Sequence, residues 1–356
     1  MNKKQELLKG NIALAEGAIS AGCDAYFGYP ITPQNELIAH MSKRMIELGR
    51  AFVQAESEIS AINMVFGAAA AGRMAMTSSS SPGISLKQEG ISYLAGCELP
   101  AVIVNVQRGG PGLGNISGSQ GDYYQSTRGG GHGDYRTMVY APYTVAEMFQ
   151  IARQSFVKAF EYRNPVLIHT DGVLGQMVEP VDSSILDTVN VKVDSSDWAL
   201  TGAKGREPRF IKSLLMGEGD LEAHNLKLMK KYETINMKEI LFEENNTEDA
   251  EIVIIAYGIS ARIALSAIES LRSNGIKAGL LRPITLWPFP SDAIKKLADS
   301  VKVFLSLELS LGQMVDDVRL AVNGMRPVEF YGRAGGGIFD SEEVEEKIKE
   351  ILRKYK

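Results

Sequence analysis

A threonine held between two prolines is the first candidate for chemistry. It is Thr32, in the stretch GYPITP at residues 28–33. The residues before it predict a short strand and those after it a helix, so we expect Thr32 at the helix N-cap and Pro33 at the first helical position. The hydroxyl can act only as a cap, or it can join the helix N-terminus in a site for a small anion. The residues alone leave both interpretations open.

Two glutamates are the second candidate. Glu56 and Glu58 follow the apolar run AFVQ and precede a helix rich in small residues. Carboxylates in the first turn of a helix stabilise it through the helix dipole by roughly 0.3–1 kcal/mol. Alternatively, one of them is held in a crevice of low dielectric constant, where it exchanges protons with a cofactor. Both interpretations stay open at this point.

An arginine at the end of an apolar run is the third candidate. Arg108, in VQRGGPGLG at residues 106–114, is followed by four glycines in six residues. A guanidinium in this position can bind a carboxylate through two parallel hydrogen bonds, or it can pair with an acidic side chain on the surface. The glycines do not have the spacing of the dinucleotide-binding fingerprint, so nucleotide binding is only weakly supported.

The elements that position these residues follow from the pattern of the first 180 residues. Helical stretches alternate there with short apolar runs such as AFVQAE, RMAMTSS, PAVIVNVQR and PVLIHTDG. This alternation predicts a largely parallel sheet with helices on both faces. Ligands of such sheets bind outside the carboxyl ends of the strands. Since Thr32, Glu58 and Arg108 each follow an apolar run, we expect them at one edge of the sheet.

The remainder of the chain predicts a linking segment and a second α/β unit. Residues 181–248 are polar and charged with no obvious core, which is typical of an excursion between domains. Residues 249–356 return to alternating strand and helix patterns, beginning with IVIIAYG and ARIALSAIESLRSNG. Gly275 is expected at the C′ position after that helix. The predicted fold class is therefore α/β, with two domains and largely parallel sheets.

The composition excludes several function classes. The chain has 356 residues, of which 45% are hydrophobic and 23% charged, and a net charge of −5. Mild acidity without a basic stripe gives no indication of nucleic-acid binding. The sequence shows no targeting signal and no apolar run of membrane-spanning length. Its two cysteines, Cys23 and Cys97, are too few for an iron–sulfur cluster. We expect a cytoplasmic protein that contacts neither nucleic acid nor a membrane.

Five segments, in the same order, resemble the α subunit of the 2-oxoacid:ferredoxin oxidoreductases. They are GYPITP (28–33), QAESEISAINMVFGAA (54–69), MTSSSSPGISLKQEGISYLAGCELP (76–100), VQRGGPGLG (106–114) and GGGHGDYR (129–136). The resemblance continues to about residue 180 and, more weakly, through LLRPITLWPFP. It implies two domains of the thiamine-enzyme type. Residues 1–180 would form the pyrimidine-binding domain, and residues 249–356 the domain similar to the transketolase C-terminal domain.

The resemblance also implies roles for single residues. These enzymes bind thiamine diphosphate between subunits and decarboxylate a 2-oxoacid oxidatively. The acyl group passes to coenzyme A, and electrons pass through iron–sulfur clusters to ferredoxin. The position matching Glu58 places its carboxylate against N1′ of the aminopyrimidine, where a shared proton promotes loss of the thiazolium proton. Thr32 and Arg108 match the positions that contact the 2-oxoacid. Tyr29 and Pro30, in the same motif as Thr32, are assigned to the cofactor site.

Other subunits are expected because parts of the family's machinery are absent from this sequence. We find no convincing copy of the Gly-Asp-Gly stretch and later asparagine that hold the diphosphate and Mg²⁺, and no cysteine cluster. The resemblance therefore implies a β subunit for the diphosphate, Mg²⁺ and a [4Fe-4S] cluster. It further implies γ and ferredoxin-like δ subunits, coenzyme A as co-substrate, ferredoxin as acceptor, and a dimer of heteromers.

The substrate class follows from the same resemblance. The segment 76–100, together with RGGPGLG, looks like that of members acting on the branched-chain 2-oxoacid 2-oxoisovalerate (3-methyl-2-oxobutanoate). Many 2-oxoglutarate members carry Ser-Thr where this chain has Gly112 and Leu113, so the loop beside Arg108 is more apolar here. The alternatives are a 2-oxoglutarate:ferredoxin oxidoreductase α subunit, a two-subunit thiamine dehydrogenase that uses no ferredoxin, and a non-catalytic scaffold.

Overall fold

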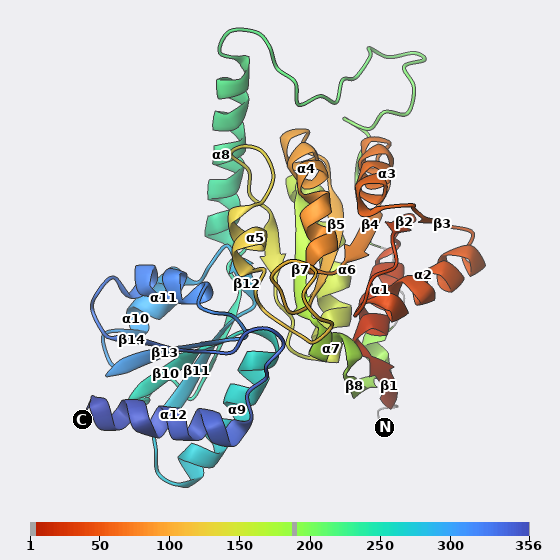
Figure 1. Ribbon diagram of the computed structural model, residues 1–356. Coiled ribbons are helices and arrows are strands. Elements are labelled where there is room, and N and C mark those ends of the chain that lie inside the picture. The colour runs from red at the N-terminus through yellow and green to blue at the C-terminus, as the bar shows by residue number, and fades with distance from the viewer. Residues whose placement is uncertain (1–4, 187–190, 356) are drawn as a thin grey trace.

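The computed structural model describes residues 5–186 and 191–355 (Figure 1). Its strands form a seven-stranded sheet, a five-stranded sheet and a two-stranded ribbon. The seven-stranded sheet lies in the N-terminal half of the chain and the five-stranded sheet in the C-terminal half, and Figure 1 shows helices packed around both. Within the described ranges, none of the helices combines the length and the apolar character needed to cross a bilayer.

The first sheet has the strand order β12-β6-β7-β5-β4-β2-β3. All neighbouring strands in it are parallel except β12, which runs antiparallel to β6. The four apolar runs quoted above form β3, β4, β5 and β7 of this sheet, so the predicted alternation is confirmed. The strands are β2 (Ala25–Gly28), β3 (Ala51–Gln54), β4 (Ala75–Ser79), β5 (Ala101–Gln107), β6 (Met138–Tyr140), β7 (Pro165–Asp171) and β12 (Thr285–Trp287).

Helices cover both faces of this sheet. One group packs around α1, and α3 and α4 pack side by side on the opposite face (Figure 1). The chain leaves β2 toward β3 on one side but leaves β4 toward β5 on the other, so the carboxyl ends of β2 and β4 mark a topological switch point. The helices are α1 (Gly10–Ala21), α2 (Asn35–Glu47), α3 (Glu58–Ala70), α4 (Ser81–Gly96), α5 (Tyr123–Arg128), α6 (Val145–Tyr162) and α7 (Gly172–Gln176).

The second sheet has the order β14-β13-β10-β11-β9, with β9 antiparallel and the other neighbouring pairs parallel. Gly275 follows α9 at φ +78°, a left-handed conformation that glycine adopts without strain, as the C′ position requires. Its elements are β9 (Phe242–Asn245), β10 (Ile252–Ile255), α9 (Gly258–Ser273), β11 (Ala278–Pro283), α10 (Ser291–Leu297), β13 (Val303–Glu308), α11 (Met314–Val322), β14 (Val328–Gly332) and α12 (Ser341–Lys354).

The segment between the two domains contains more structure than its polar composition indicates. Its 19-residue helix α8 (Asp220–Lys238) precedes β9, and β9 pairs with the second sheet although it lies inside the predicted excursion 181–248. In Figure 1 the stretch ahead of α8 extends beyond α3 and α4. The ribbon joins β1 (Gln5–Lys9) to β8 (Val178–Asp182), which the short helix η1 (Ser183–Leu186) follows. The division into residues 1–180, 181–248 and 249–356 stays a prediction.

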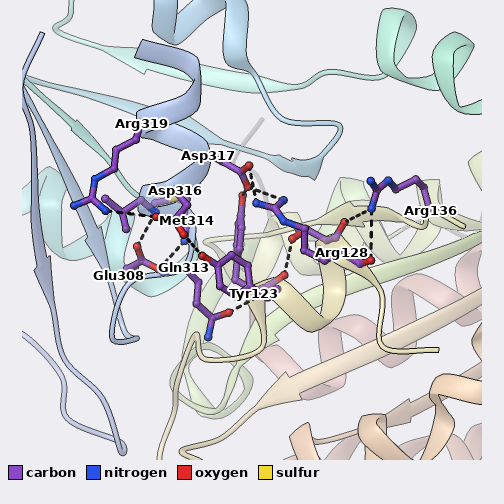
Figure 2. A network of polar contacts seen from close by, with 12 residues as sticks. Tyr123, Arg128, Arg136, Glu308, Gln313, Met314, Asp316, Asp317 and Arg319 are labelled. Atoms are coloured by element: carbon purple, nitrogen blue, oxygen red, sulfur yellow. Dashed lines mark hydrogen bonds and ion pairs between the residues drawn. The ribbon is translucent and has the colours of Figure 1, made fainter. Parts of the chain in front are cut away.

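Polar contacts join α5 of the first domain to α11 of the second (Figure 2). Tyr123 donates a hydrogen bond to Asp317 Oδ2 at 2.5 Å, and Arg128 donates to both carboxylate oxygens of Asp317 at 3.1 and 2.9 Å. The buried carboxylate of Glu308 accepts hydrogen bonds from backbone N–H groups at the start of α11. The second domain thereby holds α5, which follows the loop that carries Arg108.

Candidate active site

The three candidate residues lie at the carboxyl edge of the first sheet. Thr32 follows β2, Glu58 follows β3 and Arg108 follows β5. The loop after β4 lies among them, because β4 pairs with β2 on one side and with β5 on the other. The structure thus places all three side chains around the switch point, where open parallel sheets bind their ligands.

Burial distinguishes the two glutamates. Glu58 is the first residue of α3 and is only 6% exposed, and Ser79 Oγ on β4 donates to its Oε1 at 3.5 Å. Glu56 is exposed and contacts the hydroxyl of Ser60. The helix is capped by Ser57, whose side chain accepts from the N–H of Ser60 at 3.2 Å. Of the two glutamates, Glu58 is therefore the one whose carboxylate the fold buries.

The expectation that Thr32 caps a helix is wrong. Helix α2 begins at Asn35, and its N-cap residue is Gln34. The N–H of Gln34 donates to Ile31 O at 3.1 Å and closes a turn that delays the helix, which leaves Pro33 outside it. The Thr32 hydroxyl accepts a hydrogen bond from Asn35 Nδ2 at 3.1 Å, and this hydrogen bond is exposed to solvent. Because it caps no helix N–H group, this hydroxyl stays available to a ligand.

Arg108 is not a surface residue. Its side chain is buried, with the residue 8% exposed, and it donates from Nη1 to Thr32 O and from Nη2 to Leu113 O, each at 2.9 Å. Its backbone N–H donates to Ser81 Oγ at 3.0 Å. Among the described residues no acidic side chain pairs with the guanidinium, so the positive charge beside Thr32 lacks a counterion. The structure therefore brings Thr32 and Arg108 together.

Two polar atoms at this edge have no hydrogen-bond partner within the part of the chain that the structure describes. They are Ser80 Oγ and Arg108 Nε, and both are buried. An unpaired buried polar group is costly, so such atoms mark places where a polar ligand adds hydrogen bonds. Together with the Glu58 carboxylate and the Thr32 hydroxyl, they suit an anionic substrate and a cofactor that carries N–H groups. The residues present therefore fit the implied cofactor and 2-oxoacid.

The other candidates lie on exposed loops nearby. Tyr29 and Pro30 are exposed in the loop between β2 and Thr32. In the loop after Arg108, the side chain of Leu113 is 80% exposed. A cavity of about 500 Å³ beside Thr32 is also lined by residues 336 and 338 of the second domain. The loops that carry Tyr29, Pro30 and Leu113 are thus exposed at the sheet edge that carries Thr32.

Sequence reasoning missed the buried polar side chains that support these loops. Ser78 Oγ donates to Gln34 Oε1 at 2.6 Å, which fixes the start of α2 against β4. Asp122 accepts from Ser81 Oγ and from Asn105 Nδ2, at 2.6 and 2.8 Å, and burial raises the pKa of the Asp122 carboxyl. Runs of short polar residues at the carboxyl end of an apolar strand, such as the four serines 78–81 at the end of β4, are the signal that could have found them.

Asp171 at the end of β7 gives a testable pH dependence. It caps α7 by accepting from two backbone N–H groups, and burial raises its pKa from 3.8 to about 6. The folded protein binds this proton more tightly than the unfolded chain, so stability is lost as the pH rises through about 4 to 6. Asp171→Asn keeps a good cap without the charge. We expect the variant to lack this loss and to be about 1–3 kcal/mol more stable at pH 7.

Urea unfolding at pH 4 and pH 7 measures this effect. Asp299→Asn, at an exposed aspartate, is the matched control and should change the free energy of unfolding little at either pH. Equal stability of wild type and Asp171→Asn at both pH values would show that the buried carboxyl does not titrate in this range.

Two family models match the chain across both domains. Residues 16–240 match the model described as pyruvate flavodoxin/ferredoxin oxidoreductase, thiamine diphosphate-binding, and residues 250–344 match pyruvate:ferredoxin oxidoreductase core domain II. The chain belongs to the pyruvate flavodoxin/ferredoxin oxidoreductase family. This family assignment confirms the resemblance found in the five segments. It also agrees with the α/β fold class of the thiamine-enzyme type.

Relatives in the pyruvate flavodoxin/ferredoxin oxidoreductase family align over nearly the whole chain. The ketoisovalerate oxidoreductase subunit VorB of Methanothermobacter thermautotrophicus is 53% identical, with 97% of each chain covered. The 2-oxoglutarate synthase subunit KorA of Methanothermobacter marburgensis is 35% identical, with 97% of this chain and 98% of KorA covered.

A solved structure shows the same fold. It is the 2-oxoglutarate:ferredoxin oxidoreductase from Magnetococcus marinus with 2-oxoglutarate, coenzyme A and succinyl-CoA bound, matched at a TM-score of 0.87 and 24% identity. The match covers 98% of this chain but only 65% of that one, so this chain spans about two thirds of the length of that chain.

Proposed function

We propose that this chain is the α subunit of a 2-oxoacid:ferredoxin oxidoreductase that acts on a branched-chain 2-oxoacid of the 2-oxoisovalerate type. The observation that carries the proposal is the buried guanidinium of Arg108, which lies against Thr32 without a counterion among the described residues. A buried cation of this kind is stabilised by an anion, and the carboxylate of a 2-oxoacid fits it through two hydrogen bonds.

Glu58 is proposed to act on the cofactor. When bound, thiamine diphosphate supplies a thiazolium that accepts the electrons left by decarboxylation. Glu58 lies buried at the start of α3, where Ser79 contacts it and Gly83 of α4 lies close to it, so its carboxylate can hold a proton at the N1′ position of the aminopyrimidine. Tyr29 and Pro30 are exposed beside this edge and are proposed to contact the same cofactor.

Gly83 allows α4 to approach Glu58 and gives a test of that geometry. A Cβ at Gly83 would lie 2.0 Å from Ser79 Oγ and 2.5 Å from Glu58 Oε1, so both side chains would have to move. We expect Gly83→Ala to lower turnover of the assembled enzyme by about 10²-fold, the usual effect of displacing a reacting group by about 1 Å.

The matched control for this variant is Gly67→Ala. Gly67 is an exposed helical glycine with open space around it, and the change is expected to leave turnover intact. Turnover of Gly83→Ala equal to wild type would contradict the proposed role of the Glu58 position.

Partner subunits are proposed because this chain supplies only part of the site. Exposed apolar side chains surround the Glu58 edge, including Val53, Ile59 and Leu86 at 39%, 49% and 51% exposure. A β subunit covering them would bring the diphosphate, Mg²⁺ and a [4Fe-4S] cluster, with γ and ferredoxin-like δ subunits completing the path to ferredoxin. In the described residues, no group of three or more His, Cys, Asp or Glu is arranged to hold a metal ion.

The branched-chain substrate is supported by the loop after Arg108. Leu113 and Ile116 present exposed apolar side chains there, and the apolar tail of 2-oxoisovalerate suits them better than the second carboxylate of 2-oxoglutarate. The VorB relative, at 53% identity, is also more similar than the KorA relative, at 35%.

Anaerobic purification of the tagged chain with its partners tests this function. We expect co-purifying subunits with bound thiamine diphosphate, iron and sulfide, and coenzyme A-dependent ferredoxin reduction that prefers 2-oxoisovalerate to 2-oxoglutarate. A strong preference for 2-oxoglutarate would overturn the substrate class. A complex without thiamine diphosphate would overturn the function itself.

A further inference from the structure

The loop that follows Arg108 is joined to the second domain at two points. This Arg108 loop comprises residues 109–122 and ends at α5. Its carbonyl at Leu113 accepts a hydrogen bond from Arg108 Nη2 at 2.9 Å, so the loop holds one side of the guanidinium. The other side is held by Thr32 O, which accepts from Nη1 at 2.9 Å. A movement of the loop therefore moves the group that is proposed to bind the 2-oxoacid.

The first joining point is Gln120, a buried side chain near the end of the Arg108 loop. Gln120 is 1% exposed, and its Nε2 donates to Tyr257 O at 2.8 Å. Its Oε1 accepts from Ser260 Oγ at 2.7 Å and from the N–H of Leu309 at 2.9 Å. Tyr257 and Ser260 lie at the start of α9, and Leu309 follows β13. One side chain thus fixes the end of the loop to two elements of the second domain.

The second joining point is Asn115, in the middle of the Arg108 loop. Asn115 Nδ2 donates to Gly335 O of the second domain at 2.6 Å, and its Oδ1 accepts from the N–H of Ser117 at 3.0 Å. Its own N–H donates to Gly109 O at 2.8 Å, and the N–H of Gly109 donates to Ser117 O at 2.9 Å. These bonds close residues 109–117 into a turn, and Asn115 links that turn to the second domain.

Glycines on both sides of the Asn115 contact let the two backbones approach closely. A Cβ at Gly109 would lie 3.0 Å from Gly335 C and from Gly336 N. A Cβ at Gly336 would lie 2.5 Å from Ser117 Cβ and 3.0 Å from Asn115 Oδ1. Gly336 also has a φ of +89°, a left-handed conformation that is strained for other residues. Close packing therefore sets the position of the loop together with the hydrogen bonds.

The segment 333–340, between β14 and α12, carries these glycines and is itself anchored in the second domain. The N–H of Arg333 donates to Glu308 O at 3.3 Å, and the Arg333 guanidinium forms an ion pair with Glu343 of α12. At the other end of the segment, Phe339 is buried at 4% exposure. The glycines of the contact thus belong to a segment that is fixed at both ends.

We propose that Asn115 is a positioning residue through which the second domain holds Arg108 in place for the carboxylate of the 2-oxoacid. The proposal rests on the proposed function of Arg108 and adds that the second domain takes part in substrate binding. A guanidinium binds a carboxylate through two parallel hydrogen bonds of fixed geometry, so a small displacement weakens the binding. Asn115 acts through the loop, whose Leu113 carbonyl orients the guanidinium.

Asn115→Ala and Gly336→Ala change the contact from its two sides, and steady-state kinetics of the assembled complex measure the effect. We expect Asn115→Ala to raise KM for 2-oxoisovalerate about 3- to 10-fold, as the loss of a hydrogen bond does. Gly336→Ala displaces the loop itself, so its KM should rise about 10- to 100-fold. In both variants kcat should stay within about twofold of wild type, because the contact affects binding of the carboxylate and not the chemical step.

A double-mutant cycle tests whether Asn115 acts through Arg108. In the Arg108→Ala background, Asn115→Ala should change kcat/KM by less than about twofold, because the guanidinium that it positions has been removed. Asn115 is exposed, so its replacement is expected to leave folding and assembly intact. An equal loss of kcat/KM in the two backgrounds would show that Asn115 acts independently of Arg108, and would overturn the proposal.

Gly337→Ala is the matched control for the glycine variant. A Cβ at this neighbouring glycine meets other atoms only at 3.4 Å and beyond, which is ordinary contact, so KM should equal that of wild type. A wild-type KM in both Asn115→Ala and Gly336→Ala would overturn the proposal. If Gly336→Ala does not assemble, a wild-type KM in Asn115→Ala alone would overturn it.

Failure of the proposed function gives a different result, namely an unchanged KM in Arg108→Ala. Hydrogen–deuterium exchange of the backbone amides of residues 109–117, followed by mass spectrometry, then still reports on Asn115. Faster exchange in Asn115→Ala than in wild type would show that this side chain holds the loop. Equal exchange would overturn that part of the proposal as well.

Discussion

Glu58→Gln is expected to slow hydrogen–deuterium exchange at the thiazolium carbon of the bound cofactor by about 10²–10⁴-fold. Glutamine has nearly the same shape but cannot hold the proton that the carboxylate shares with the aminopyrimidine. The fold should be preserved, because Ser57 rather than Glu58 caps α3. Quenched-flow exchange followed by NMR of the released cofactor measures the rate in the assembled complex.

Glu56→Gln is the matched control for this experiment. Glu56 lies two residues earlier but is exposed, so its replacement should leave the exchange rate at the wild-type value. Equal exchange rates in Glu58→Gln and wild type would show that the buried carboxylate is not the cofactor's proton partner.

Arg108→Ala is expected to lower kcat/KM for 2-oxoisovalerate by about 30- to 5,000-fold, which corresponds to the roughly 2–5 kcal/mol cost of leaving a charge unpaired in a buried site. The effect should appear mainly in KM, because the guanidinium binds the substrate carboxylate before and during the reaction. Arg108→Lys should recover only part of the loss, since an ammonium cannot make two parallel hydrogen bonds.

Steady-state kinetics of the assembled complex separate kcat from KM for these variants. Arg73→Ala is the control, because Arg73 is exposed in the connection ahead of β4, at the opposite edge of the sheet. Its KM should equal that of wild type. An unchanged KM in Arg108→Ala would remove the residue from the substrate site.

The sequence was enough to predict that the site lies at the carboxyl edge of the first sheet, because that edge follows from the order of apolar runs and polar residues along the chain. Each candidate directly follows an apolar run, and carboxyl ends of parallel strands share an edge. The burial that separates Glu58 from Glu56 could not be predicted. It depends on α4 approaching α3 at Gly83, a contact between elements that the local sequence does not describe.

The start of α2 and the burial of Lys87 could not be predicted from the local sequence either. Cap rules use local sequence, which favoured Thr32 and Pro33, whereas the helix starts after Gln34, whose side chain accepts a hydrogen bond from Ser78, 44 residues away. A lysine in a helix is normally solvated, so nothing in the segment 76–100 indicates that Lys87 is fully buried. Likewise, the three-residue strand β12 joins the first sheet through a long-range pairing with β6.

The measurement that tests the central claim most directly is 2-oxoacid-dependent ferredoxin reduction by the complex reconstituted from this chain and its partners, with wild type compared to Glu58→Gln. We predict reduction that requires 2-oxoisovalerate, coenzyme A and thiamine diphosphate in the wild-type complex, and a loss of at least about 10²-fold in the variant. Equal rates in the two complexes, or reduction that continues without thiamine diphosphate, would contradict the assignment of this sheet edge as a thiamine-dependent active site.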